Sequence, residues 1–171
     1  MGERTELCGN LINRVMQVEM LSEDIASYSF TRTVWKDLVL PRVELFIWFI
    51  LTGRVNMKER LSRLGVVNQE DVVCVLCNES VESGYHLFLG CEFSWQSCPR
   101  MLKEHFQSWT ELSTSKQERK RWMVSFCTII WNIWLERNRR IFQNKEKGAD
   151  DIIYQSSMNY KEWIGVDPFC G

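Results

Sequence analysis

Four metal-ligating residue types at short spacing constrain this chain more than any other feature. The chain reads Cys74-Val-Leu-Cys77, then His86 and then Cys91, which is the pattern C-x2-C-x8-H-x4-C. Three thiolates and one imidazole complete a tetrahedral zinc site and leave no position open for water or substrate. The sequence therefore predicts one structural Zn²⁺ ion around which part of the chain folds.

Buried free cysteines are the competing interpretation, because cysteine is among the residue types most often buried. The Cys-x2-Cys pair with His86 and Cys91 close behind favours metal. One helical turn that starts at His86 brings His86 and Cys91 to the same ion if the turn ends at Gly90. Cys98, seven residues past Cys91, is the rival fourth ligand. Cys127 lies among apolar residues at helical spacing, so we expect it in the core.

Length and composition set the class of protein. A chain of 171 residues with 45% hydrophobic residues is long enough for one domain with a real core. The seven cysteines are odd in number and follow no secretory signal, which argues against a disulfide framework. The longest apolar stretch, near residues 45–51, is too short to cross a bilayer. We expect a soluble, intracellular protein with no membrane partner.

Apolar residues recur at helical spacing along most of the chain after Thr33. Helices are expected at 42–51, 57–64, 92–109, 118–144 and 151–163, with a short strand at 72–75 before the cysteine pair. The helix at 118–144 is the longest and is apolar on a broad face. The fold class is mainly α: a small helical domain built around a CCHC zinc site, with a long C-terminal amphipathic helix.

Local signals mark where the early helices begin and end. Pro41 suits the entry of the first helix, whose dense apolar residues indicate burial, and Gly53 ends it. Asn56 and Glu59 have the spacing of a capping box, with Asn56 as N-cap of the next helix. Gly65 suits the C-terminal cap of that helix.

Further residues share an order and spacing with a known family. They are Trp35, Pro41-Arg-Val43, Phe46-Ile-Trp-Phe49, Gly53-Arg-Val-Asn56, Arg60-Leu61, the four candidate ligands, Glu82, Ile130-Trp-Asn-Ile-Trp134, Glu136-Arg-Asn138 and Ile141-Phe142. This pattern resembles the zinc-binding domain after the reverse transcriptase of plant LINE-type (non-LTR) retrotransposons. The resemblance implies that Cys74, Cys77, His86 and Cys91 hold the zinc ion. Where the family commonly has Trp after its last zinc cysteine, this chain has Cys98.

The resemblance divides the chain into three parts. Residues 1–32 match poorly, residues 33–147 form the reverse-transcriptase-type zinc-binding domain with its following helix, and residues 148–171 are an acidic tail. The chain is too short to hold an endonuclease and a polymerase as well. Asp150 and Asp151 lack the preceding aromatic residue of a polymerase hairpin, so we interpret them as a solvated helix start. A retrotransposon origin also implies a place in the nucleus.

Basic residues between 101 and 147 carry the first functional hypothesis. Ten Lys and Arg stand there against five Asp and Glu, although the net charge of the chain is −1. Lysine and arginine neutralise phosphates, so RNA or DNA is the expected partner. The candidate contacts are Arg119, Lys120, Arg121, Arg137, Arg139 and Arg140. The competing interpretations are a solvated polar helix face and favourable charge at a helix C-terminus.

A structural or protein-interaction module without nucleic-acid binding is the alternative, with the helix 118–144 docking a protein partner.

An enzyme is the third hypothesis. Cysteine–histidine pairs exist at Cys91 with His86 and at Cys98 with His105, but zinc explains the first pair better. The second pair has no orienting carboxylate that the sequence identifies. We therefore expect no enzyme, no catalytic residue and no small-molecule substrate.

Overall fold

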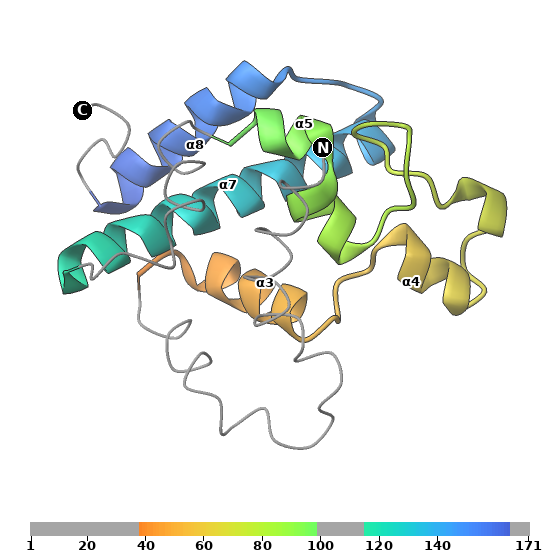
Figure 1. The fold of residues 1–171 in the computed structure, drawn as a ribbon, viewed down its shortest axis with the longest axis horizontal. Coiled ribbons are helices and arrows are strands. Elements are labelled where there is room, and N and C mark those ends of the chain that lie inside the picture. The colour runs from red at the N-terminus through yellow and green to blue at the C-terminus, as the bar shows by residue number, and fades with distance from the viewer. Residues whose placement is uncertain (1–37, 99–114, 165–171) are drawn as a thin grey trace.

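The computed structural model describes residues 38–98 and 115–164 (Figure 1). Within them the helices are α3 (Pro41–Leu51), α4 (Lys58–Arg63), α5 (Glu92–Gln96), α7 (Lys116–Gln143) and α8 (Ala149–Ile164). A 3₁₀ turn (Gln69–Asp71) and a π-helical turn, η4 (His86–Gly90), complete the described elements. The fold is mainly α, as the sequence predicts.

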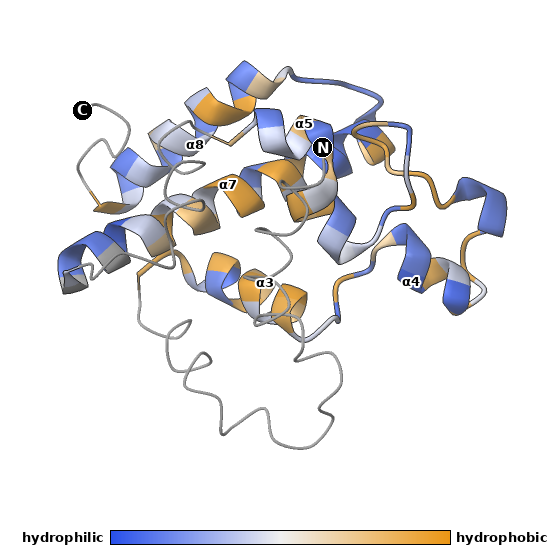
Figure 2. Cartoon of the chain, viewed as in Figure 1, coloured by the Kyte–Doolittle hydropathy of each residue, from blue (hydrophilic) through white to orange (hydrophobic). Residues whose placement is uncertain are grey.

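Helix α7 is the centre of the arrangement, with α3 along one side and α8 along the other (Figure 1). Helix α5 follows η4 directly and also contacts α8. Apolar residues of α3 and α7 gather where the helices face each other, whereas α4 is largely hydrophilic (Figure 2). One continuous core therefore joins the N-terminal and C-terminal halves of the described chain.

The sequence explains why α7 begins and ends where it does. Ser115 Oγ accepts a hydrogen bond from the Glu118 amide at 3.2 Å, and the Glu118 carboxylate accepts one from the Ser115 amide at 2.8 Å. This reciprocal capping box fixes the helix start. Asn144 ends the helix in the left-handed region, at φ 51°. The long helix expected at 118–144 is confirmed, with Cys127 buried in its core face.

Helix α3 confirms the role of Pro41, which occupies the first turn and lacks the amide that a helix start leaves unpaired. Its buried face packs on α7 through Phe46, whose ring centroid lies 5.4 Å from that of Trp131 and 5.2 Å from that of Trp134. Gly53 follows with φ 61°, a conformation that favours glycine. The helix therefore ends where the sequence indicates.

Helix α4 corrects one expectation, because Asn56 is not its N-cap. The Lys58 amide donates to Glu82 Oε1 at 3.1 Å, and the Glu59 amide donates to the Glu82 carbonyl at 3.2 Å. The Asn56 side chain instead accepts a hydrogen bond from Arg60. A buried glutamate from a later segment thus supplies the cap that a local motif suggests.

Helix α4 also lacks a buried apolar face. None of the residues of α4 is buried, and Leu64 just beyond it is 62% exposed. Gly65 does adopt the left-handed conformation of a C-terminal cap, at φ 72°. The strand expected at 72–75 is reduced to a single antiparallel bridge between Val73 and Val81, because the chain turns away at Cys74.

Helix α8 confirms the helix expected at 151–163 and begins two residues earlier. Asp151 accepts a hydrogen bond from the Gly148 amide at 3.0 Å, and Asp150 and Asp151 are both exposed, as a solvated helix start requires. Ile152 and Tyr160 are buried at 2% and 1% exposure. The acidic tail therefore contributes a packed helix to the core.

Three expectations fall outside the described residues: the part of helix 92–109 beyond Cys98, the segment 1–32, and His105. Among the helices that the structure does describe, none combines the length and the apolar character needed to cross a membrane.

Candidate metal centre

A short hairpin presents the first two cysteines. The Val73–Val81 bridge lies at its base, and the Cys74 amide donates to the Ser80 carbonyl at 2.8 Å. The Asn78 amide donates back to the Cys74 carbonyl at 2.8 Å, with Asn78 in the left-handed region at φ 57°. This tight turn places Cys77 over Cys74.

The second pair of candidate ligands comes from η4. Ser83 Oγ accepts a hydrogen bond from the His86 amide at 3.0 Å, which fixes the start of the turn. The Cys91 amide donates to the His86 carbonyl at 2.7 Å and closes it. The turn ends at Gly90, as expected, and Cys91 is extended before α5 begins. His86 and Cys91 therefore face the same point.

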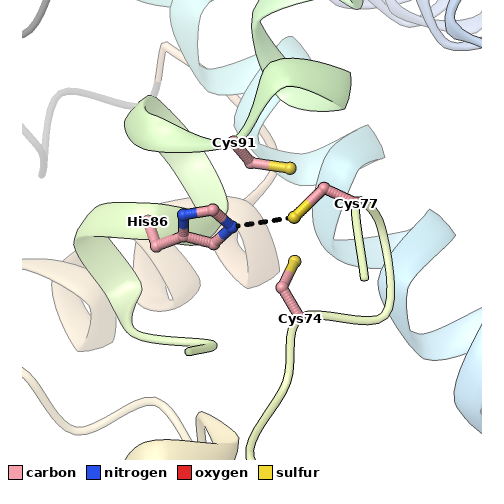
Figure 3. A group of neighbouring side chains, drawn as sticks. All are labelled: Cys74, Cys77, His86 and Cys91. Atoms are coloured by element: carbon pink, nitrogen blue, oxygen red, sulfur yellow. Dashed lines mark hydrogen bonds between the residues drawn. The ribbon is translucent and has the colours of Figure 1, made fainter. Parts of the chain in front are cut away.

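The four side chains converge (Figure 3). One ligand atom from each of Cys74, Cys77, His86 and Cys91 lies within 4.8 Å of all the others, and Cys77 Sγ lies 3.2 Å from His86 Nε2. Tetrahedral zinc with bonds of about 2.3 Å to sulfur sets its sulfur atoms about 3.8 Å apart. The chain therefore contains a Cys₃His cluster compatible with one zinc ion.

Burial separates the ligands into two kinds. Cys74 and Cys91 are fully buried, whereas Cys77 and His86 are half-buried. Cys98, the rival ligand, is buried but does not belong to this cluster. An ion held here is thus shielded by the fold on one side and is closest to solvent at Cys77 and His86.

Backbone amides also stabilise negative charge on two of the cysteine sulfurs. Those of Leu76 and Cys77 donate to the Cys74 sulfur, and those of Phe93 and Ser94 donate to the Cys91 sulfur. The hydrogen bond shared by the two sulfurs raises the pKa of Cys74, where burial acts in the same direction, and lowers the pKa of Cys91. Amide donors of this kind stabilise sulfur in its ligating form.

Three of the six candidate nucleic-acid contacts are engaged inside the protein. Arg137 is 5% exposed and donates to the fully buried Glu82 from Nε at 3.2 Å and from Nη2 at 2.6 Å. Arg139 and Arg140 both donate to the buried Glu136. The structure therefore places these guanidinium groups against carboxylates of the chain itself.

Arg140 also reaches the candidate metal centre. Its Nη1 donates to the carbonyls of Val75 and Leu76, at 3.3 and 3.2 Å, and its Nη2 donates to the Lys147 carbonyl. Sequence reasoning missed this contact and the roles of Glu82 and Glu136. The signal was present, because both glutamates stand among the residues that carry the family resemblance.

The remaining three candidates lie near the start of α7. Lys120 and Arg121 are exposed, and Arg119 belongs to the same turn of the helix. The structure therefore brings the four metal candidates together, whereas it pairs Arg137, Arg139 and Arg140 with carboxylates and leaves Lys120 and Arg121 exposed.

Comparison with known proteins identifies a domain within the chain. A family model described as the zinc-binding domain in reverse transcriptase matches residues 16–97, a span that includes all four residues of the cluster. This segment is a reverse-transcriptase zinc-binding domain. The match begins at residue 16, inside the segment 1–32 that resembles the family poorly.

A plant relative supports the same family. An Arabidopsis thaliana protein named as a candidate ribonuclease H protein is 27% identical over 147 residues, an alignment that covers 79% of this chain and 23% of the relative. The chain thus spans about a quarter of the length of the relative. No solved structure matches the chain.

Proposed function

We propose that this chain is a zinc-stabilised, non-catalytic module, derived from the polyprotein of a LINE-type retrotransposon, that binds RNA or DNA. The observation that carries the proposal is the closed Cys₃His cluster inside a reverse-transcriptase zinc-binding domain. Cys74, Cys77, His86 and Cys91 would hold the ion. Zinc with four protein ligands stabilises a fold, since it keeps no coordination position for a reacting group.

The zinc ion would join two segments that local structure alone does not connect. The hairpin that carries Cys74 and Cys77 has a single bridge, and η4 is one turn long. Neither element is stable by itself, because isolated hairpins and short helical turns are marginal in water. Four bonds to one ion fix both against each other.

Nucleic-acid binding rests on the basic side chains that remain at the surface. Lys120 and Arg121 are exposed near the start of α7, where no carboxylate pairs with them in the described residues. Exposed Arg54 also lies over the Trp48 ring, at 5.2 Å from its centroid, and single-stranded bases stack on such aromatic groups. These residues supply both phosphate and base contacts.

The test is binding of labelled single-stranded RNA and duplex DNA to the zinc-loaded chain, measured against salt concentration. Lys120→Ala with Arg121→Ala should weaken binding and lower the salt slope by about two, since each phosphate contact contributes about one. The matched control is Arg63→Ala with Lys161→Ala, which removes the same charge from exposed positions on α4 and α8. A zinc-loaded, folded chain that binds neither nucleic acid contradicts this part of the proposal.

A protein-interaction module is the second candidate, and α8 favours it. Tyr154 and Met158 lie one turn apart and are 63% and 44% exposed. Large apolar side chains in this arrangement suit a helix that packs on another protein. Failure of the nucleic-acid test, with zinc still bound, would leave this candidate as the better account.

A further inference from the structure

Arg140 has an unusual position for a basic residue near the end of a long helix. It lies on α7, more than sixty residues from the cysteine pair, yet it donates to the carbonyls of the two residues between Cys74 and Cys77. Its side chain is 8% exposed, so these bonds form away from bulk water. A charged donor at that depth makes stronger hydrogen bonds than a neutral or solvated one.

The two carbonyls belong to the peptide units that serve the metal centre. The Val75 carbonyl shares its peptide unit with the Leu76 amide, and the Leu76 carbonyl shares its peptide unit with the Cys77 amide. Both amides donate to the Cys74 sulfur. Arg140 thus donates to the carbonyl groups of the two peptide units whose amide groups face the Cys74 sulfur. These hydrogen bonds orient the peptide dipoles and strengthen the amides as donors.

Arg140 contacts the other half of the centre as well. Its guanidinium carbon lies 4.5 Å from the centroid of the Phe93 ring, and the Phe93 amide donates to the Cys91 sulfur. Glu136 holds the guanidinium in place, with Oε1 accepting from Arg140 Nε at 2.9 Å. One arginine therefore touches both ligand-bearing segments and is itself positioned by a buried carboxylate.

We propose that Arg140 is the positioning residue of the zinc centre: through the Val75 and Leu76 carbonyls and the Phe93 ring it sets the geometry of both ligand pairs, Cys74 with Cys77 and His86 with Cys91. The inference rests on the proposed zinc ligands. Outer-sphere partners of this kind commonly change metal affinity by about 10- to 100-fold. Arg140 would supply that contribution from a helix that provides no ligand.

The experiment measures zinc affinity by chelator competition and the absorption spectrum of the Co²⁺-loaded chain. Arg140→Gln should weaken zinc binding by about tenfold and shift the cobalt bands that report tetrahedral thiolate coordination. Arg140→Lys, which keeps the charge but not the forked donor, should recover part of the loss. Arg139→Gln is the matched control, since Arg139 shares the carboxylate of Glu136 but makes no bond to the cysteine turn in the described contacts.

Ile152→Ala separates this role from a general loss of stability, because it removes a buried side chain of α8 and should lower the melting temperature of the fold. Zinc affinity should fall in Arg140→Gln and not in Ile152→Ala. Equal loss in both variants, or an Arg140→Gln affinity and cobalt spectrum equal to those of Arg139→Gln, overturns the inference. A wild-type chain that binds no zinc defeats the proposed function itself and is distinguishable from either result.

Discussion

At the scale of single residues, buried carboxylates decide what the arginines of α7 do. Glu82 and Glu136 are 0% and 2% exposed, and each is bonded to arginine from α7. Glu82 still has one oxygen, Oε2, without a hydrogen-bond partner among the described residues. A buried charge of this kind is tolerated only while its partner is present. Arg137 and Arg140, which composition marks as nucleic-acid contacts, are therefore required by the fold.

Removing Arg137 tests this point. Arg137→Ala should lower the free energy of unfolding by about 3–5 kcal/mol, because it leaves the Glu82 carboxylate buried and uncompensated. Lys120→Ala, at an exposed position of the same helix, should change it by less than about 0.5 kcal/mol. Urea unfolding of the zinc-loaded chains measures both. Equal stability of the two variants would show that the Glu82–Arg137 pair does not hold the fold.

Cys127 gives a prediction about pH. Burial, with a smaller effect of the Glu44 charge, raises the pKa of its thiol from 9.0 to about 12. The unfolded thiol therefore ionises above pH 9.0 while the folded thiol stays protonated, so stability is full below pH 9.0 and falls as pH rises toward 12. At pH 10 the loss from this group is about 1.4 kcal/mol.

The comparison that isolates this group is Cys127→Ala. Between pH 8 and pH 10 the variant should lose about 1.4 kcal/mol less unfolding free energy than wild type, as measured by denaturant titration at each pH. The difference between the two pH values is compared within each chain, which removes the cost of the cavity. The same loss in both chains would mean that Cys127 ionises freely in the folded state.

At the scale of elements, sequence rules hold where an element is decided by its own residues. Periodicity and end signals locate α3, α7 and α8 within two residues, since each buries one continuous apolar face. They also locate α4 within one residue but give it the wrong cap, because the capping partner of the Lys58 amide is 24 residues away. The strand near Cys74 fails for a related reason, because the cysteine turn interrupts the pairing. A local motif cannot reveal a bond that only the folded chain creates.

Two alanine substitutions compare a real cap with an apparent one. Ser115→Ala should destabilise the chain by about 1 kcal/mol, because it removes a capping box at the start of α7. Asn56→Ala should cost less than about 0.5 kcal/mol, since its side chain bonds only to the Arg60 guanidinium among the described contacts. Thermal unfolding gives both values. A larger cost at Asn56 would restore the capping box that the sequence suggests.

At the scale of the whole molecule, the zinc centre and the helical core are distinct but connected. The four candidate ligands follow from sequence spacing alone, and the structure brings them together as that spacing predicts. The link to α7 through Arg140 and Arg137 could not be predicted, because it joins residues 55 to 65 positions apart. Composition does not distinguish paired from free cations, so it could not separate the carboxylate-bound Arg137, Arg139 and Arg140 from the exposed Lys120 and Arg121.

Metal removal tests how far the two parts depend on each other. Chelation should expose the amides of residues 72–94 to hydrogen exchange while residues 149–164 keep most of their protection, since α8 packs on α7 through apolar side chains. Far-ultraviolet circular dichroism should show that most helix survives. Loss of protection in both regions together would mean that zinc holds the entire fold.

The measurement that tests the central claim most directly is the zinc content per chain of protein purified without chelator. We predict about one zinc ion in wild type and in Cys98→Ser, the rival ligand, and loss of that ion in both Cys77→Ser and His86→Ala. A folded wild-type chain without zinc, or a Cys77→Ser chain that keeps its ion, would contradict the assignment.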